Sequence, residues 1–270
     1  MTRTDRQHGD IIPHAALRTP HSLGVLLLHG LTSGRTTVDG LVPHLEARDI
    51  PYQLPILRGH GTRAEDLAGA TWHHWYEDAE RALDRLLDDC DRAVVMGLSM
   101  GGVVALHLAA QRPERLAGVV AVAPALRLNI SGQALLPLLA RSGRYATVDV
   151  GRAFVDPDLA KGSTNYTRVP ISAVYSLARY GAVVERVLPR VRVPLLVLYT
   201  PRDRVVRPVG AREVYDKAGT PAAQKKLLAF EDSGHEMLMD RSREAVFAAI
   251  MDFIEERRAA TGDGAVAAGV

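Results

Sequence analysis

Apolar runs and stretches of helical periodicity alternate along most of this chain. Continuous runs rich in Leu and Val are typical of strands buried in a parallel sheet, and they predict strands at 23–28, 50–54, 93–96, 116–123, 193–200 and 224–230. Between them, apolar residues recur at helical spacing and predict helices at 36–48, 71–88, 100–111, 210–218 and 244–256. This alternation indicates an α/β fold with helices on both faces of a mostly parallel sheet.

The alternation is interrupted over residues 125–190. This segment contains several glycines and an Asp156-Pro157 pair, and only 172–185 has the pattern of a helix. An irregular insertion of this size between buried strands predicts a cap over a site, with the core formed by 1–124 and 191–270. Its apolar residues either line an acyl pocket or only fix the cap to the core, and periodicity does not separate these alternatives. They are Leu135, Leu136, Leu138, Leu139, Phe154, Tyr175 and Leu177.

Composition narrows the class of protein. The formal net charge of +2 and the spread of basic residues along the chain do not favour a nucleic-acid partner. Cys90 is the only cysteine, which fits a reducing compartment. Residues 1–10 are polar and indicate no signal peptide, and the apolar window 93–110 divides into a strand and a helix, which argues against an integral membrane segment. A cytoplasmic protein is therefore expected, with an N-terminal arm over 1–20 and a disordered tail from Ala259. Nothing in the pattern indicates an oligomeric state.

The clearest chemical signal is the run Gly97-Leu98-Ser99-Met100-Gly101, which joins an apolar strand to a helix. This G-x-S-x-G pattern is typical of a sharp turn that presents a serine hydroxyl clear of the sheet. The helix that starts at this turn has unpaired N–H groups that favour developing negative charge. We therefore expect Ser99 to be a nucleophile and the backbone N–H of Met100 to stabilise an oxyanion.

A second loop, His29-Gly30-Leu31, follows the first predicted strand. An H-G motif at this place, upstream of G-x-S-x-G, predicts the other oxyanion donor, the backbone N–H of Leu31. His29 is expected to brace the loop by hydrogen bonding. His60 is an alternative catalytic histidine, but its glycine neighbours and its place before the serine favour a structural role.

Asp203 and His235 follow two later predicted strands, as Ser99 follows an earlier one. The carboxyl ends of parallel strands share one edge of a sheet, so the three side chains are expected to meet there. A histidine is the base that a serine needs near neutral pH, and a carboxylate on its other nitrogen orients it. Asp232 and Asp240 are rival acids, although Asp232 would have to fold back and Asp240 is expected near the last helix.

Taken together, these motifs resemble those of α/β hydrolases, in particular bacterial carboxylesterases and monoacylglycerol lipases with a small cap. The resemblance covers about residues 22–256 and carries over to His29-Gly30-Leu31, the G-x-S-x-G run, Asp203 and Ser233-Gly234-His235. It implies a Ser-His-Asp triad of Ser99, His235 and Asp203 with donors at Leu31 and Met100. It also implies a small-molecule ester substrate with a short or medium acyl chain, an acyl-enzyme and no cofactor.

Other activities are compatible with the same motifs. A thioesterase, an acyltransferase or another triad hydrolase would carry the same residues, because the pocket and not the fold sets the substrate. A non-catalytic hydrolase-fold receptor is a further alternative. A serine at the centre of the turn disfavours epoxide and haloalkane hydrolases, which need a carboxylate nucleophile. No histidine pair has metal-ligand spacing with a third ligand nearby, so no metal site is predicted.

Overall fold

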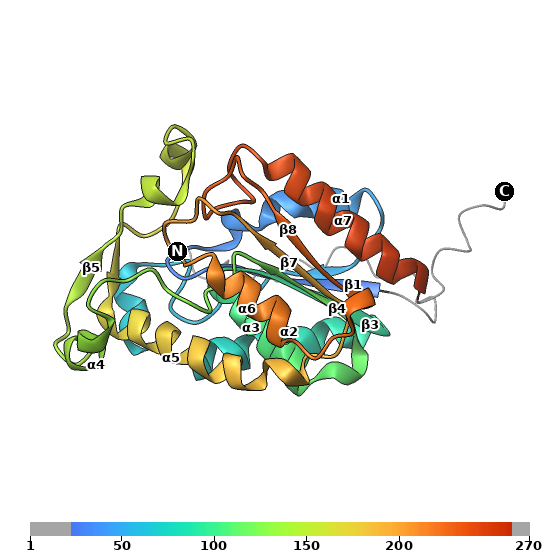
Figure 1. The fold of residues 1–270 in the computed structure, drawn as a ribbon, viewed down its shortest axis with the longest axis horizontal. Coiled ribbons are helices and arrows are strands. Elements are labelled where there is room, and N and C mark those ends of the chain that lie inside the picture. Colours follow the sequence, from blue (N-terminus) through green and yellow to red (C-terminus); the bar gives the residue numbers. More distant parts are fainter. Residues whose placement is uncertain (1–22, 261–270) are drawn as a thin grey trace, which may run out of the picture.

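The central feature of the computed structural model, which describes residues 23–260, is a parallel sheet. Six strands of the described chain form it in the order β2-β1-β3-β4-β7-β8 (Figure 1). They are β1 (Leu23–Leu28), β2 (Tyr52–Gln53), β3 (Arg92–Leu98), β4 (Leu116–Val122), β7 (Leu195–Tyr199) and β8 (Lys225–Ala229). Each lies within or close to an expected apolar run, which confirms the predicted fold class. The arm expected over 1–20 lies outside the described residues.

Helices cover both faces of the sheet. On one face lie α1 (Val42–Glu46) and α7 (Arg243–Ala260), and on the other lie α2 (Trp72–Asp89), α3 (Met100–Gln111), α5 (Ile171–Val187) and α6 (Val209–Lys217) (Figure 1). The two cores follow from strand geometry, because successive side chains of a strand point to opposite faces. In β1, Leu26 and Leu28 belong to the core with α2 and α3, whereas Val25 and Leu27 belong to the core with α1 and α7.

The helix ends agree with local sequence signals at several places. Thr71 caps α2 as expected, in a reciprocal capping box with His74. The last helix is longer than expected, so that Ala259 and Ala260 belong to α7 and only the tail after them lies outside the described residues. No helix within residues 23–260 is both long and apolar enough to cross a bilayer.

The helix expected over 36–48 is wrong in its extent. Two short 3₁₀ turns, Arg35–Thr37 and Asp39–Leu41, precede an α1 of five residues. In a continuous helix over 36–48, Pro43 would lie in the interior, where it removes a backbone hydrogen bond; in the structure it lies in the first turn of α1, where its missing N–H is tolerated. Three apolar positions of the pattern, Val38, Leu41 and Leu45, are nevertheless fully buried.

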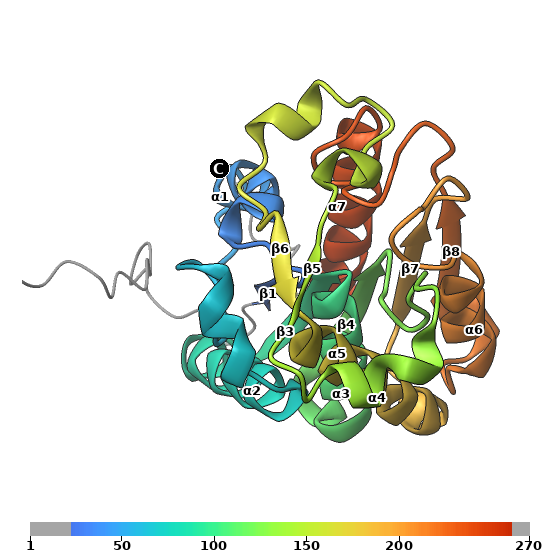
Figure 2. The same cartoon turned by 90° about the vertical axis from the view of Figure 1, so that its left-hand side faces the viewer.

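Residues 123–194, between β4 and β7, form a segment that we call the insertion. It holds α4 (Leu136–Leu139), α5 and an antiparallel pair of strands, β5 (Tyr145–Thr147) and β6 (Arg168–Pro170). Figure 1 shows α4 and β5 beyond the left-hand end of the sheet, and Figure 2, turned by 90°, shows the same segment in front of the strands. In contrast, α5 packs against α3, and its Tyr180 and Val184 are fully buried.

Candidate functional site

Ser99 lies between β3 and α3, in a backbone conformation that few residues other than glycine adopt. Its φ is 57° and its ψ is −112°. Such strain costs about 1–3 kcal/mol and persists only where the surroundings impose it. Here Gly97 and Gly101 allow the strand and helix to approach, because a Cβ at Gly97 would lie 2.1 Å from the carbonyl of Gly101. The predicted sharp turn at Ser99 is therefore present.

Asp203 and His235 are joined by a hydrogen bond although 32 residues separate them. His235 Nδ1 lies 2.7 Å from Asp203 Oδ2, and both side chains are almost fully buried. The other carboxylate oxygen, Oδ1, accepts the backbone N–H groups of Val205 at 2.8 Å and Val206 at 2.9 Å. Asp203 is thus fixed by its own loop, and a proton on Nδ1 of His235 leaves Nε2 as the basic nitrogen.

The surroundings of His235 act on its pKa in opposite directions. Burial of the imidazole favours the neutral form and lowers the pKa, but the charge of Asp203, its hydrogen bond and the charge of Glu236 raise it. The raising effects are larger together, and the pKa of His235 lies above its ordinary value of 6.5.

A cavity of about 410 Å³ brings these elements to one place. Ser99, Leu31 and His235 line it from the core side, and Met100 follows Ser99 as the first residue of α3. The opposite wall comes from the insertion and is mostly apolar. Its aliphatic residues are Leu128, Ile130, Leu136, Leu139, Val148, Val150, Val169, Ile171, Val174 and Leu177.

The apolar residues singled out in the insertion are thus divided between both expected roles. Leu136, Leu139 and Leu177 line the cavity. Phe154 is buried outside it, so it packs without lining the cavity, and Leu135 and Leu138 are exposed on the surface. The spacing of apolar residues in the sequence did not separate these roles, because a side chain that faces a cavity and one that faces the core are both apolar.

The two early histidines support the loop that carries Leu31. The backbone N–H of Leu57 donates to His29 Nε2 at 3.1 Å, and His29 Nδ1 contacts the carbonyl oxygen of Gly30 at 2.9 Å. His60 Nδ1 lies 3.0 Å from the carbonyl of Leu57, and the His29 and His60 rings meet edge to face. Burial lowers the pKa of His29 to about 4 and that of His60 to about 3. His29 therefore braces the loop as expected, and His60 has structural contacts.

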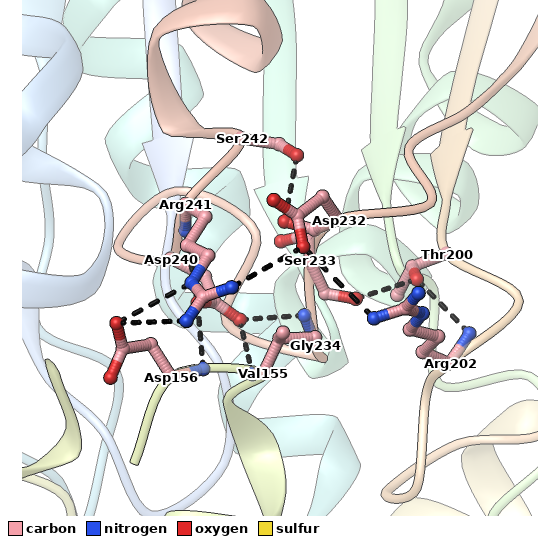
Figure 3. Close-up of polar contacts among 10 residues, drawn as sticks. All are labelled: Val155, Asp156, Thr200, Arg202, Asp232, Ser233, Gly234, Asp240, Arg241 and Ser242. Atoms are coloured by element: carbon pink, nitrogen blue, oxygen red, sulfur yellow. Dashed lines mark hydrogen bonds and ion pairs between the residues drawn. The ribbon is translucent and has the colours of Figure 1, made fainter. Parts of the chain in front are cut away.

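The two rival acids have other partners than the imidazole of His235, and Figure 3 shows those contacts. Asp232 is exposed and pairs with Arg241, with 3.8 Å between the charged atoms. Asp240 is 99% buried and instead accepts backbone N–H groups: those of Gly234 and Val155 reach Oδ2 at 2.6 Å, and that of Arg241 reaches Oδ1 at 2.9 Å. Asp240 thus ties the loop of His235 to the insertion, a role that the sequence analysis did not predict.

Two more polar residues at the cavity were not singled out from the sequence. Glu236, next to His235, accepts a hydrogen bond on Oε1 from Nδ2 of Asn165 in the insertion, at 2.8 Å. Both residues line the cavity. The available signal was the acidic residue directly before the apolar run Met237–Met239, since a carboxyl group beside such a run is seldom buried without a reason.

Comparison with known proteins places this geometry in a family. The family model described as serine aminopeptidase, S33, matches residues 19–242. The chain is 28% identical to a thermostable monoacylglycerol lipase of Bacillus sp. (strain H-257) over 236 residues, 86% of this chain and 90% of the relative. It is 23% identical to a carboxylesterase of Bacillus subtilis, over 86% of this chain and 92% of the relative.

The fold is likewise similar to that of solved structures. A structure from work on LipS and LipT, two metagenome-derived lipolytic enzymes, superimposes with a TM-score of 0.80 and 30% sequence identity. The match covers 87% of this chain and 94% of that one. The parallel sheet, the turn at Ser99 and the extent of these matches together show that the chain belongs to the S33 serine aminopeptidase family of α/β hydrolases and is an enzyme of the esterase and lipase type.

Proposed function

We propose that this protein hydrolyses carboxylic esters of short or medium acyl chains, monoacylglycerols among them, with Ser99, His235 and Asp203 as a catalytic triad. The observation that carries the proposal is the bond of His235 to Asp203 beside a cavity that His235 shares with Ser99. The names of the relatives, a monoacylglycerol lipase and a carboxylesterase, support an ester as the substrate.

In the proposed reaction, the Ser99 hydroxyl attacks the ester carbonyl while Nε2 of His235 accepts its proton. The imidazolium so formed is stabilised by Asp203 and then protonates the leaving alcohol, which leaves an acyl group on Ser99. Water, activated by the same histidine, releases the acid. The backbone N–H groups of Leu31 and Met100 are the proposed oxyanion donors, and one such donor commonly contributes about 10²–10³ in rate.

The insertion acts in this proposal as a cap that holds the acyl chain. Its aliphatic wall matches the hydrocarbon part of an ester, and burial of each methylene group is worth about 0.8 kcal/mol. The cavity volume of about 410 Å³ lies within the range of small-molecule binding sites. A cavity of this size favours esters with short or medium acyl chains.

The test is hydrolysis of p-nitrophenyl butyrate by the wild-type protein and by Ser99→Ala. We expect turnover by the wild type, none above background by the variant, and labelling of Ser99 by a fluorophosphonate probe. A folded wild-type protein that neither turned over the ester nor reacted with the probe would contradict the proposal and favour a non-catalytic receptor. A series of p-nitrophenyl esters and monoacylglycerols, compared by kcat/KM, then gives the preferred chain length.

A further inference from the structure

Among the polar residues of the cavity wall is a hydrogen-bonded pair that the proposed triad does not use. Glu236 and Asn165 meet there, from the loop of His235 and from the insertion. Only 5% of the surface of Glu236 is exposed. After the bond between Nδ2 and Oε1 is formed, each side chain retains one buried oxygen, Glu236 Oε2 and Asn165 Oδ1, and neither has a hydrogen-bond partner within the described protein.

The backbone on each side of the pair is fixed by hydrogen bonds. The N–H of Glu236 donates to the carbonyl of Ala153 at 3.0 Å, and the N–H of Tyr166, next to Asn165, donates to the carbonyl of Thr32 at 2.8 Å. Thr32 follows Leu31, the proposed oxyanion donor. The pair is therefore attached to the two loops that carry the proposed catalytic groups.

A buried polar atom without a partner costs free energy, so such atoms in a native protein call for an explanation. An aliphatic acyl chain in the cavity would leave both oxygens unpaired. A hydroxyl group of the substrate supplies the missing donor. Burial raises the pKa of Glu236 above its ordinary value, against the lowering effects of His235 and Asn165. A hydroxyl group both donates and accepts hydrogen bonds, so it suits this carboxyl group in either protonation state.

We propose that Glu236 and Asn165 are specificity-determining residues that bind a free hydroxyl on the alcohol part of the ester. This inference rests on the proposed function, because it assigns a substrate feature to the same site. Esters of polyols are then preferred to esters of simple alcohols that have the same acyl chain and the same number of alcohol carbons.

The test compares glyceryl monobutyrate with propyl butyrate, which has the same acyl chain and a three-carbon alcohol without hydroxyl groups. For Glu236→Met, we expect the ratio of kcat/KM for glyceryl monobutyrate to kcat/KM for propyl butyrate to fall about 10- to 100-fold, the effect of losing one or two hydrogen bonds. Both values are taken on the alkaline plateau of the pH profile, where a changed pKa of His235 affects neither ester. Asn165→Leu is expected to act in the same direction. Glu236→Gln, which retains hydrogen-bonding atoms, is expected to keep most of the preference for the glyceryl ester.

The matched control is Glu231→Met, which replaces an exposed glutamate earlier in the same loop and should alter neither rate. Thermal unfolding and probe labelling of Ser99 show whether each variant is folded with an intact nucleophile, and Asn165→Leu carries the test if Glu236→Met does not fold. Equal losses for both esters, or no loss for either, would overturn the inference while leaving the proposed ester hydrolysis intact. A wild-type protein inactive on both esters and on p-nitrophenyl butyrate would overturn the proposed function itself.

Discussion

The buried carboxylate of Asp240 accepts the backbone N–H of Gly234 at 2.6 Å, one residue before His235. The same oxygen accepts the N–H of Val155 in the insertion, also at 2.6 Å (Figure 3). The side chain of Asp240 therefore fixes both the loop that carries His235, the proposed base, and the part of the insertion that contains Val155. The close fit leaves no room for a side chain at residue 234, since a Cβ there would lie 2.4 Å from the carbonyl oxygen of Ala153.

We expect Asp240→Ala to lower the free energy of unfolding by about 3 kcal/mol, because it leaves several buried N–H groups without an acceptor. The loop of His235 also loses its anchor, so kcat should fall more than KM changes. Urea unfolding and steady-state kinetics measure the two effects. Asp232→Ala, which removes an exposed carboxylate from the same loop, should cost no more than about 0.5 kcal/mol. Equal losses in the two variants would contradict the anchoring role.

Gly101→Ala tests the close contact beneath Ser99. A Cβ at residue 101 would lie 2.2 Å from the carbonyl oxygen of Leu28, a backbone atom that cannot rotate away. We expect a loss of more than about 3 kcal/mol of stability or failure to fold. Gly34→Ala is the control, because nothing lies within 4 Å of its added Cβ, and its midpoint of urea unfolding should stay close to that of the wild type. A Gly101→Ala protein of wild-type stability would show that the turn has more room than the structure gives it.

The pH dependence of the proposed hydrolysis follows from His235. A protonated imidazole cannot accept the proton of Ser99, so kcat/KM should rise with pH through the pKa of His235, which lies above 6.5. Half of the maximal kcat/KM for p-nitrophenyl butyrate is therefore expected above pH 6.5. Asp203→Asn removes the charge that raises this pKa, so the midpoint should move to lower pH and kcat should fall by about 10⁴. A flat profile between about pH 5 and 8 would argue against a histidine base.

The stability of the fold should decrease on acidification because of His29 and His60. Their pKa values are about 4 and 3 in the folded protein, whereas an unfolded chain protonates them near 6.5. The unfolded state thus binds more protons below pH 6.5, and each group removes up to about 1.4 kcal/mol of unfolding free energy per pH unit until its folded pKa is reached. The raised pKa of His235 has its effect above pH 6.5, outside this range.

Urea unfolding between pH 7.5 and 4.5 measures this dependence. His60→Gln should reduce its slope between about pH 6.5 and 4.5 relative to the wild type. His73→Gln, at an exposed position of α2, is the control for a general effect of losing an imidazole. An identical slope in the wild type and in His60→Gln would show that His60 does not stay neutral in the folded protein.

Much of the fold was predictable from local pattern. Every residue of the strand Leu23–Leu28 is buried, and a strand that is buried on both faces has a continuous apolar sequence. This strand could therefore be recognised from the sequence. The turn at Ser99 was predictable because two glycines and a serine at fixed spacing suit that backbone geometry. The helix expected over 36–48 was wrong in extent, because apolar spacing does not distinguish a continuous α-helix from 3₁₀ turns followed by a short helix that contains Pro43.

The sequence by itself therefore determined the sheet, the turn at Ser99 and a short set of polar residues at strand ends, because each depends on neighbours along the chain. Only the tertiary structure decided which carboxyl group meets His235: Asp203 lies 2.7 Å from it, whereas Asp240, nearer in sequence, binds backbone N–H groups. It also decided that Glu236 meets Asn165, 71 residues away. Contacts of this kind depend on how loops from distant strands pack together, and no local pattern of residues encodes that packing.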